Sequence, residues 1–80
     1  MDKNKRLQIA EHNSDAIILE DFDDAIIGIS ECGRVVYSIN IIYDILFSNG
    51  MDQNDIVEYV DYNIIYSYLG EFSPIYTYQL

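Results

Sequence analysis

The sequence predicts an α+β domain of order β-β-α-α-β, in which a small three-stranded sheet, made of a hairpin and a C-terminal strand, carries two helices packed on one face. Three observations predict this fold. Two β-branched runs flank a glycine-containing loop, a capped helical pattern covers residues 53–69, and a short β-branched and aromatic run follows the single proline, Pro74. Because 80 residues have room for only one core, we expect a single domain.

The beginning of the chain is polar and lacks a clear period, which predicts a loosely ordered lead-in or a frayed helix over residues 1–14. The folded domain is expected over residues 15–80. Residues 16–19 form a short apolar piece that the sequence does not assign to helix or strand. The acidic run over residues 20–24 indicates a turn.

The hairpin is predicted from two runs rich in Ile, Val and Tyr, at residues 25–29 and 34–37. The residues between them, 30–33, end in Gly33, and glycine in a short connection between such runs is typical of a β-hairpin.

The first predicted helix covers residues 39–48. Ser38 can cap it, and Ile42, Ile45 and Leu46 recur at helical spacing within it. Asn49 and the glycine after it are typical of a helix end.

The second helix is predicted over residues 53–69. Asp52 is placed as the N-cap and Asp55 three residues later, an arrangement that resembles a capping box and puts acid at the positive end of the helix dipole. Gly70 follows the end of the pattern. After Pro74, residues 75–78 are predicted to form the closing strand.

The second helix has two contrasting sides when its residues are placed 100° apart. The predicted core side consists of Ile56, Val57, Val60, Ile64 and Tyr68. The opposite side is a tyrosine stripe flanked by carboxylates: Asp55, Glu58, Tyr59, Tyr62 and Tyr66. This stripe is either partly buried between the sheet and the first helix or a binding or self-association surface, because tyrosine supplies contact area at small entropic cost. With Asp61 beside it, the stripe defines the predicted partner-binding residues: Asp55, Glu58, Tyr59, Asp61, Tyr62 and Tyr66.

The net charge is −10, from four Lys and Arg against fourteen Asp and Glu. Three of the four cations, Lys3, Lys5 and Arg6, lie at the beginning of the chain, and the fourth is Arg34. All six charged side chains from residue 35 to residue 80 are acidic. Such a field repels nucleic-acid backbones and anionic membrane surfaces, and it favours a partner protein with a basic surface.

The residues that could carry catalysis or bind a metal do not form a complete site. His12 is the only histidine and lies in the segment predicted to be loose, so no nucleophile and base arrangement can be assembled around it. Cys32 has no second cysteine, which excludes a redox pair and an internal disulfide. The acids at 20–24 lack the spacing of a calcium loop, and whether they bind another hard cation stays open. We therefore expect no enzyme activity, no metal and no cofactor.

A cytoplasmic location is the expectation from the sequence. A lone cysteine favours a reducing compartment, and polar residues follow the basic N-terminus where a signal peptide would have its apolar core. The longest apolar runs are far below the roughly 20 residues that span a bilayer.

Several short motifs are spread along the chain: FDDAIIGI at 22–29, YS at 37–38, GMD at 50–52, DI at 55–56, EY at 58–59, YN at 62–63 and GEFSPI at 70–75. In these motifs the chain resembles a family of small uncharacterised proteins encoded by tailed bacteriophages and prophages, whose members have an FDDALIGI stretch, a tyrosine with a helix cap, a GMT-x-EEA-x-EY-x-x-FN helix and a GE-x-TP-x-F tail. The sequence departs from the family at Ile41 and Ser48, where basic residues are usual. The resemblance implies a phage protein acting in the bacterial cytoplasm and brings no catalytic residues.

Two functions follow as expectations. The first is a non-enzymatic accessory protein that binds a host protein with a basic surface and inhibits a nucleic-acid-handling or defence enzyme, in some cases by imitating DNA. The alternative is a self-assembling structural protein that uses the tyrosine stripe as a homo-oligomer interface.

Overall fold

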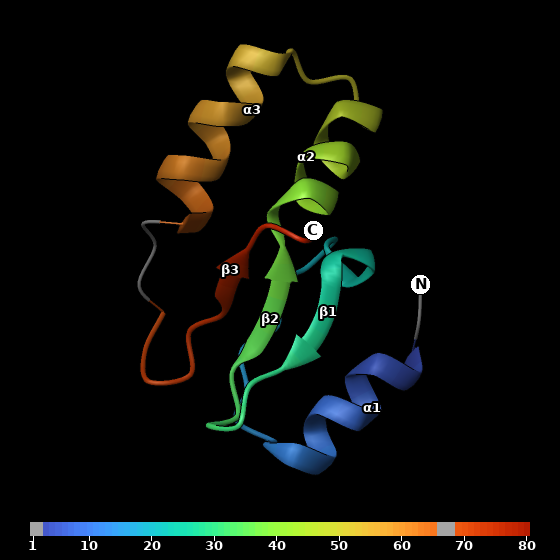
Figure 1. Cartoon of the computed structure of the whole chain (residues 1–80), viewed down its shortest axis with the longest axis vertical. Coiled ribbons are helices and arrows are strands. Elements are labelled where there is room, and N and C mark those ends of the chain that lie inside the picture. The colour runs from blue at the N-terminus through green and yellow to red at the C-terminus, as the bar shows by residue number, and fades with distance from the viewer. Residues whose placement is uncertain (1–2, 66–68) are drawn as a thin grey trace.

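The computed structural model describes residues 3–65 and 69–80. Its elements are α1 (Lys3–His12), β1 (Ile26–Ile29), β2 (Val35–Ser38), α2 (Ile39–Ser48), α3 (Gln53–Val60) and β3 (Ile75–Thr77), as Figure 1 shows. A 3₁₀ turn, Asp23–Ala25, precedes β1, and a π-helical turn, Asp61–Ile65, continues α3. The predicted fold class and the order β-β-α-α-β are confirmed, with α1 as an additional helix before the sheet.

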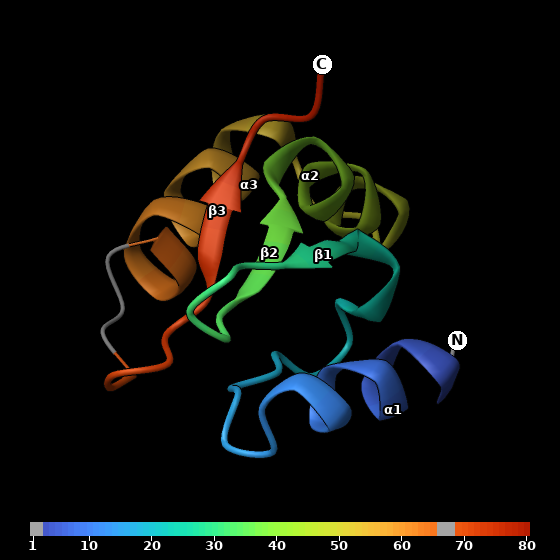
Figure 2. The same cartoon turned by 60° about the horizontal axis from the view of Figure 1, so that its bottom comes forward.

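The sheet is mixed and has the order β1-β2-β3. β1 pairs antiparallel with β2, whereas β3 pairs parallel with β2 because the chain passes through α2 and α3 before it returns. Figure 2 shows these two helices next to each other on one side of the sheet. Arg34 stabilises the return, since its Nε donates a hydrogen bond to the Ser73 carbonyl over 2.6 Å, just before β3.

The hairpin lies where the sequence predicts it, with ends shifted by about one residue. β1 begins at Ile26 because Ala25 belongs to the 3₁₀ turn, and the β1–β2 register shifts between Ile26 and Gly28, the mark of a β-bulge. Gly33 closes the loop at a φ of +89°, and a Cβ there would lie 2.7 Å from Nδ2 of Asn13. Both the backbone angle and the close approach of Asn13 require glycine at this position.

Helix α2 has the bounds that the sequence predicts. Ser38 is its N-cap and accepts a hydrogen bond from the backbone N–H of Ile41 over 3.3 Å. Asn49 is its C-cap, and Gly50 leaves the helix at a φ of +93°. The two ends of α2 are therefore set by local interactions: Ser38 supplies a capping hydrogen bond, and Gly50 permits the backbone angle at which the chain leaves the helix.

Helix α3 differs from the predicted helix over 53–69. It begins after Asp52 as expected, but its α-helical bonding ends at Val60 and a π-helical turn carries the chain to Ile65. The final part of the predicted helix, residues 66–68, lies outside the described residues. The acid in the first turn, Asp55, suits the positive end of the helix dipole as predicted.

The side-chain cap predicted for Asp52 is wrong. Asp52 has extended backbone angles typical of an N-cap and its carbonyl accepts the Ile56 N–H over 2.9 Å, yet its carboxylate makes no capping hydrogen bond. We expect Asp52→Ala to change the free energy of unfolding by less than about 1 kcal/mol, since only the interaction with the helix dipole is lost.

Urea unfolding compares this variant with Ser38→Ala, which removes the cap that the structure does contain and should cost about 0.5–2 kcal/mol. A larger loss for Asp52→Ala than for Ser38→Ala would show that Asp52 caps α3 in solution.

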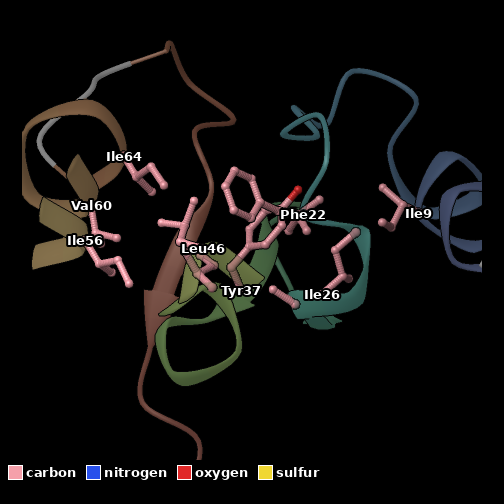
Figure 3. Packing of buried hydrophobic residues seen from close by; sticks show 11 residues of the cluster. Ile9, Phe22, Ile26, Tyr37, Leu46, Ile56, Val60 and Ile64 are labelled. Atoms are coloured by element: carbon pink, nitrogen blue, oxygen red, sulfur yellow. The ribbon is translucent and has the colours of Figure 1, made fainter. Parts of the chain in front are cut away.

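The core runs from α3 across the sheet to α1, as Figure 3 shows. Ile56, Val60 and Ile64 point from the α3 segment toward Leu46 of α2. Tyr37 of β2 lies at the centre, and Phe22, Ile26 and Ile9 lie further along the core toward α1. One continuous apolar cluster therefore joins all three helices to the sheet.

The N-terminal segment, predicted as a lead-in or a frayed helix, forms the ten-residue helix α1 in the structure. Among residues 5–12, the part of this helix whose burial is described, Ile9 alone is buried, next to Ile26, and no apolar stripe there could be revealed by a sequence pattern. Polar contacts attach it instead. Arg6 forms an ion pair with Asp23, and Asn13, just after the helix, donates a hydrogen bond to the Gly33 carbonyl over 3.0 Å.

Candidate functional site

The α3 face predicted to bind a partner faces away from the core. Asp55 and Glu58 are exposed, Tyr59 is 39% exposed and Tyr62 is 77% exposed. Asp61 is half-buried, and Tyr66 lies outside the described residues. We call Asp55, Glu58, Tyr59 and Tyr62 the α3 face.

The α3 face is exposed because the opposite side of the same segment is anchored in the core. Ile56, Val60 and Ile64 are 3%, 0% and 4% exposed. Residues three, four and seven apart share one side of a helix, so Tyr59 and Tyr62 each follow a carboxylate by one turn on the side away from these isoleucine and valine side chains. The alternative that the stripe is buried between the sheet and α2 therefore does not hold for Tyr62.

Two residues of the predicted core side have a different outcome. Val57 is 42% exposed, so its assignment to the core is wrong. The π-helical turn explains this, because it adds about one residue per turn and brings Ile64 back in line with Ile56 and Val60 and away from Val57. The other residue, Tyr68, lies outside the described residues.

The α3 face is acidic and has no cation to balance it. Both ion pairs in the described part of the chain involve Arg6, so Asp55 and Glu58 form none within it. Because no neighbouring cation neutralises these carboxylates, they give the surface a negative electrostatic potential, which attracts basic groups and repels phosphates.

The end of α2 adds an exposed aromatic residue that is not among the predicted partner-binding residues. Phe47 is 68% exposed on the last turn of α2, whereas its neighbour Leu46 is 6% exposed. The signal was present in the sequence: adjacent helical residues point about 100° apart, so Leu46 in the core places Phe47 off the core side. The α2–α3 hairpin therefore exposes aromatic groups from both of its helices.

The acidic segment at residues 20–24 is an ion-paired turn. Asp23 is 5% exposed and accepts two hydrogen bonds from Arg6, at 2.6 Å from Nε and 2.7 Å from Nη2. Its carboxylate is thus occupied by the guanidinium. Within residues 3–65 and 69–80, no three His, Cys, Asp or Glu side chains are grouped so that they could hold a metal ion.

The Arg6–Asp23 pair makes the free energy of unfolding depend on pH in the acidic range. The hydrogen bond from Arg6 lowers the pKa of Asp23 below its usual value. A carboxyl group with a lowered pKa in the folded state stabilises the protein above its unfolded-state pKa of about 3.9, and this contribution is lost as the pH falls through the folded-state value. We therefore expect the free energy of unfolding to fall steeply below about pH 4.

Urea unfolding between neutral and acidic pH measures this dependence. Asp23→Asn should be less stable at neutral pH and lose less stability on acidification than the parent. Asp24→Asn, a change at the exposed neighbouring carboxylate, is the matched control and should follow the parent curve. Equal acid sensitivity of Asp23→Asn and the parent would contradict the assignment to Asp23.

The two nucleophile or base candidates lie apart from the α3 face. His12 is the exposed last residue of α1. Cys32 is exposed in the hairpin loop, where its Sγ lies 3.1 Å from the Ser30 hydroxyl. Neither forms part of a catalytic arrangement with other described side chains.

The fold and the α3 face define the class of protein: a small acidic α+β domain with an aromatic and carboxylate-rich helix face. Among residues 3–65 and 69–80, no helix has the length and apolar character needed to cross a membrane. Comparison of the chain with protein-family models, with curated proteins and with solved structures gives no match.

Proposed function

We propose that the protein is a non-enzymatic binding protein that docks its α3 face on a partner protein with a basic surface. The observation that carries this proposal is Tyr62, a large aromatic side chain that is 77% exposed between carboxylates. Tyrosine is enriched at the centres of protein interfaces, because it combines a large apolar ring with a hydrogen-bonding hydroxyl.

The charge of the chain supports a basic partner. Residues 35–80 contain only acidic charged groups, and the net charge of the whole chain is −10. Charge complementarity of this kind accelerates association with a basic surface, and it fixes the orientation of the two proteins more than it adds affinity. Binding should therefore weaken as the salt concentration rises.

The resemblance to small phage and prophage proteins supports a role for this binding in the bacterial cytoplasm. Host enzymes that handle nucleic acids carry basic surfaces for phosphate backbones, and an acidic protein can occupy such a surface. We propose inhibition of a nucleic-acid-handling or defence enzyme of the host as the consequence of binding.

The test of this proposal is the double variant Tyr59→Ser and Tyr62→Ser. Capture of tagged protein from bacterial lysate, followed by titration of the recovered partner, should show binding weakened by at least about 2 kcal/mol, because truncating an aromatic anchor removes interface contacts. The matched control is Tyr78→Ser, which removes a 64% exposed tyrosine that follows β3 and is not part of the α3 face.

Thermal unfolding must accompany the titration. A folded double variant that binds as tightly as the parent would place the interface elsewhere. Equal losses for the double variant and Tyr78→Ser would contradict a role specific to the α3 face.

Self-assembly is the second candidate function, and the same exposed tyrosines support it. A two-fold contact between α3 faces would, however, bring Asp55 and Glu58 of one copy next to those of the other with no cation on either face, and like charges in contact destabilise an interface. Sedimentation decides between the two. A dimer that dissociates on Tyr62→Ser would support self-assembly, and a monomer at all concentrations would exclude it.

A further inference from the structure

A groove between α1 and β1 lies apart from the α3 face. It has a volume of about 190 Å³ and is lined by Lys5, Gln8, Ile9 and His12 of α1 and by all four residues of β1. The spacing of the four α1 residues places them on one side of that helix. Figure 2 shows α1 running along the β1 side of the sheet, away from α2 and α3.

Polar contacts attach helix α1 near both ends of the groove. Near its beginning, Arg6 pairs with Asp23, and just after its end Asn13 bonds to the Gly33 carbonyl. Between these contacts Ile9 is the buried apolar residue of the helix. Gly28 of β1 lines the groove, and no atom lies within 4 Å of the position where a Cβ would be, so there is room for a larger side chain at this position.

The chemistry of the groove differs from that of the rest of this acidic chain. Its lining contains no carboxylate, and it has an ammonium group, an amide and an imidazole along one rim. Lys5 is half-buried, and its Nζ donates to the carbonyls of Ile26 over 2.9 Å and Asp23 over 3.4 Å. An ammonium group has three N–H donors, so one remains for another acceptor.

Lys5 also has no ionic partner in the described part of the chain. The carboxylate of Asp23, its acidic neighbour, is occupied by Arg6. A half-buried cation beside an apolar groove is stabilised by an anion that accepts the remaining hydrogen bond.

The size of the groove limits the ligand. A protein cavity of about 150 Å³ holds one benzene molecule, so a groove of about 190 Å³ holds one six-membered ring with a carboxylate attached. Apolar contacts with Ile9, Ile26 and Ile29 suit the ring, while Lys5 suits the carboxylate.

We propose that the groove between α1 and β1 binds a small monocarboxylate whose apolar body is about the size of one six-membered ring. The carboxylate accepts the free hydrogen bond of Lys5, and the ring lies over Gly28 between Ile9 and β1. Gln8 and His12, two exposed residues that also line the groove, supply polar contacts to the carboxylate or to water.

The test is an NMR titration of isotopically labelled full chain with sodium benzoate at constant ionic strength. Backbone amides of β1 and α1 should shift with saturation. Benzyl alcohol keeps the ring without the charge, and acetate keeps the charge without the ring. Each should bind at least about tenfold more weakly than benzoate, since a charge-assisted hydrogen bond and an apolar contact each contribute at least that factor.

Three variants locate the site. Lys5→Gln removes the cation and should weaken benzoate binding about tenfold or more, whereas Lys5→Arg keeps the charge and should bind within about threefold of the parent. Gly28→Val adds a side chain at a position that lines the groove, and a β-branched residue suits this strand position, so the variant should fold and lose at least about tenfold in affinity.

Three experimental results would overturn the proposal. Absence of saturable shifts in β1, equal binding of benzoate and benzyl alcohol, or unchanged benzoate binding by folded Gly28→Val would each do so. If Lys5→Gln does not fold, Lys5→Arg and Gly28→Val still decide the question, because one keeps the cation and the other leaves Lys5 intact.

Discussion

Replacing Tyr37 by alanine should lower the free energy of unfolding by about 3–5 kcal/mol, the cost typical of deleting a buried aromatic ring. Tyr37 is 0% exposed and is among the largest fully buried side chains. Its ring stacks on Tyr76, with centroids 6.2 Å apart, and its hydroxyl accepts a hydrogen bond from the Leu19 N–H over 2.7 Å. The total free energy of unfolding of a small domain is about 5–15 kcal/mol. The variant should therefore lose a large part of its stability, which urea unfolding measures.

Tyr37→Phe separates the ring from the hydroxyl. Burial raises the pKa of Tyr37 to about 12, so at neutral pH the group is a protonated phenol. Removing it leaves the Leu19 N–H without its acceptor, which should cost about 1–3 kcal/mol. The matched control is Tyr62→Ala, because that side chain is 77% exposed, and it should change stability by no more than about 0.5 kcal/mol. Similar losses for Tyr37→Ala and Tyr62→Ala would contradict the core assignment.

This contrast shows what the sequence could predict about the fold. Tyr37 and Tyr62 are two of eight tyrosines, and residue type alone does not say which is buried. The position of a residue in its strand or helix does indicate whether it is buried. Alternation along β2 and helical spacing along α3 each assign a residue to one side of the element. The hairpin and α2 follow from such local patterns.

The features that the sequence did not predict depend on contacts between distant residues. Helix α1 is held by Arg6 and Asp23, which lie 17 residues apart, and no periodic pattern within α1 reveals that pairing. The parallel pairing of β3 with β2 likewise depends on contacts such as Arg34 to Ser73, 39 residues apart. Local spacing carries no information about these distances.

Local helical spacing also predicts only part of the candidate site. Exposure of Asp55, Glu58 and Tyr59 agrees with the helical spacing, since they lie in the α-helix that ends at Val60, and Tyr62 in the π-helical turn is exposed as well. The spacing rule fails at Val57 because the following π-helical turn moves the core side of the helix. Phe47 is not among the predicted site residues because the apolar spacing that predicts α2 does not say which of its apolar residues is exposed. The binding role of the face stays a prediction.

The π-helical turn has a measurable consequence for two apolar residues, Val57 of α3 and Ile64 of the turn itself. We expect Ile64→Ala to lower the free energy of unfolding by about 2–5 kcal/mol, because Ile64 is 4% exposed and its truncation leaves a cavity. Val57→Ala should cost less than about 1 kcal/mol, since Val57 is 42% exposed.

Urea unfolding of the two variants under one set of conditions tests the side of the helix that faces the core. A regular α-helix through residues 53–69 would place Val57 and Ile64 on the same side, and both truncations would then be costly. The structure instead turns Ile64 toward Leu46 and leaves Val57 at the surface, so the two losses should differ by at least about 1 kcal/mol. Equal losses would show that α3 continues as a regular helix in solution, and a small loss for Ile64→Ala would show that this end of α3 does not pack on the core.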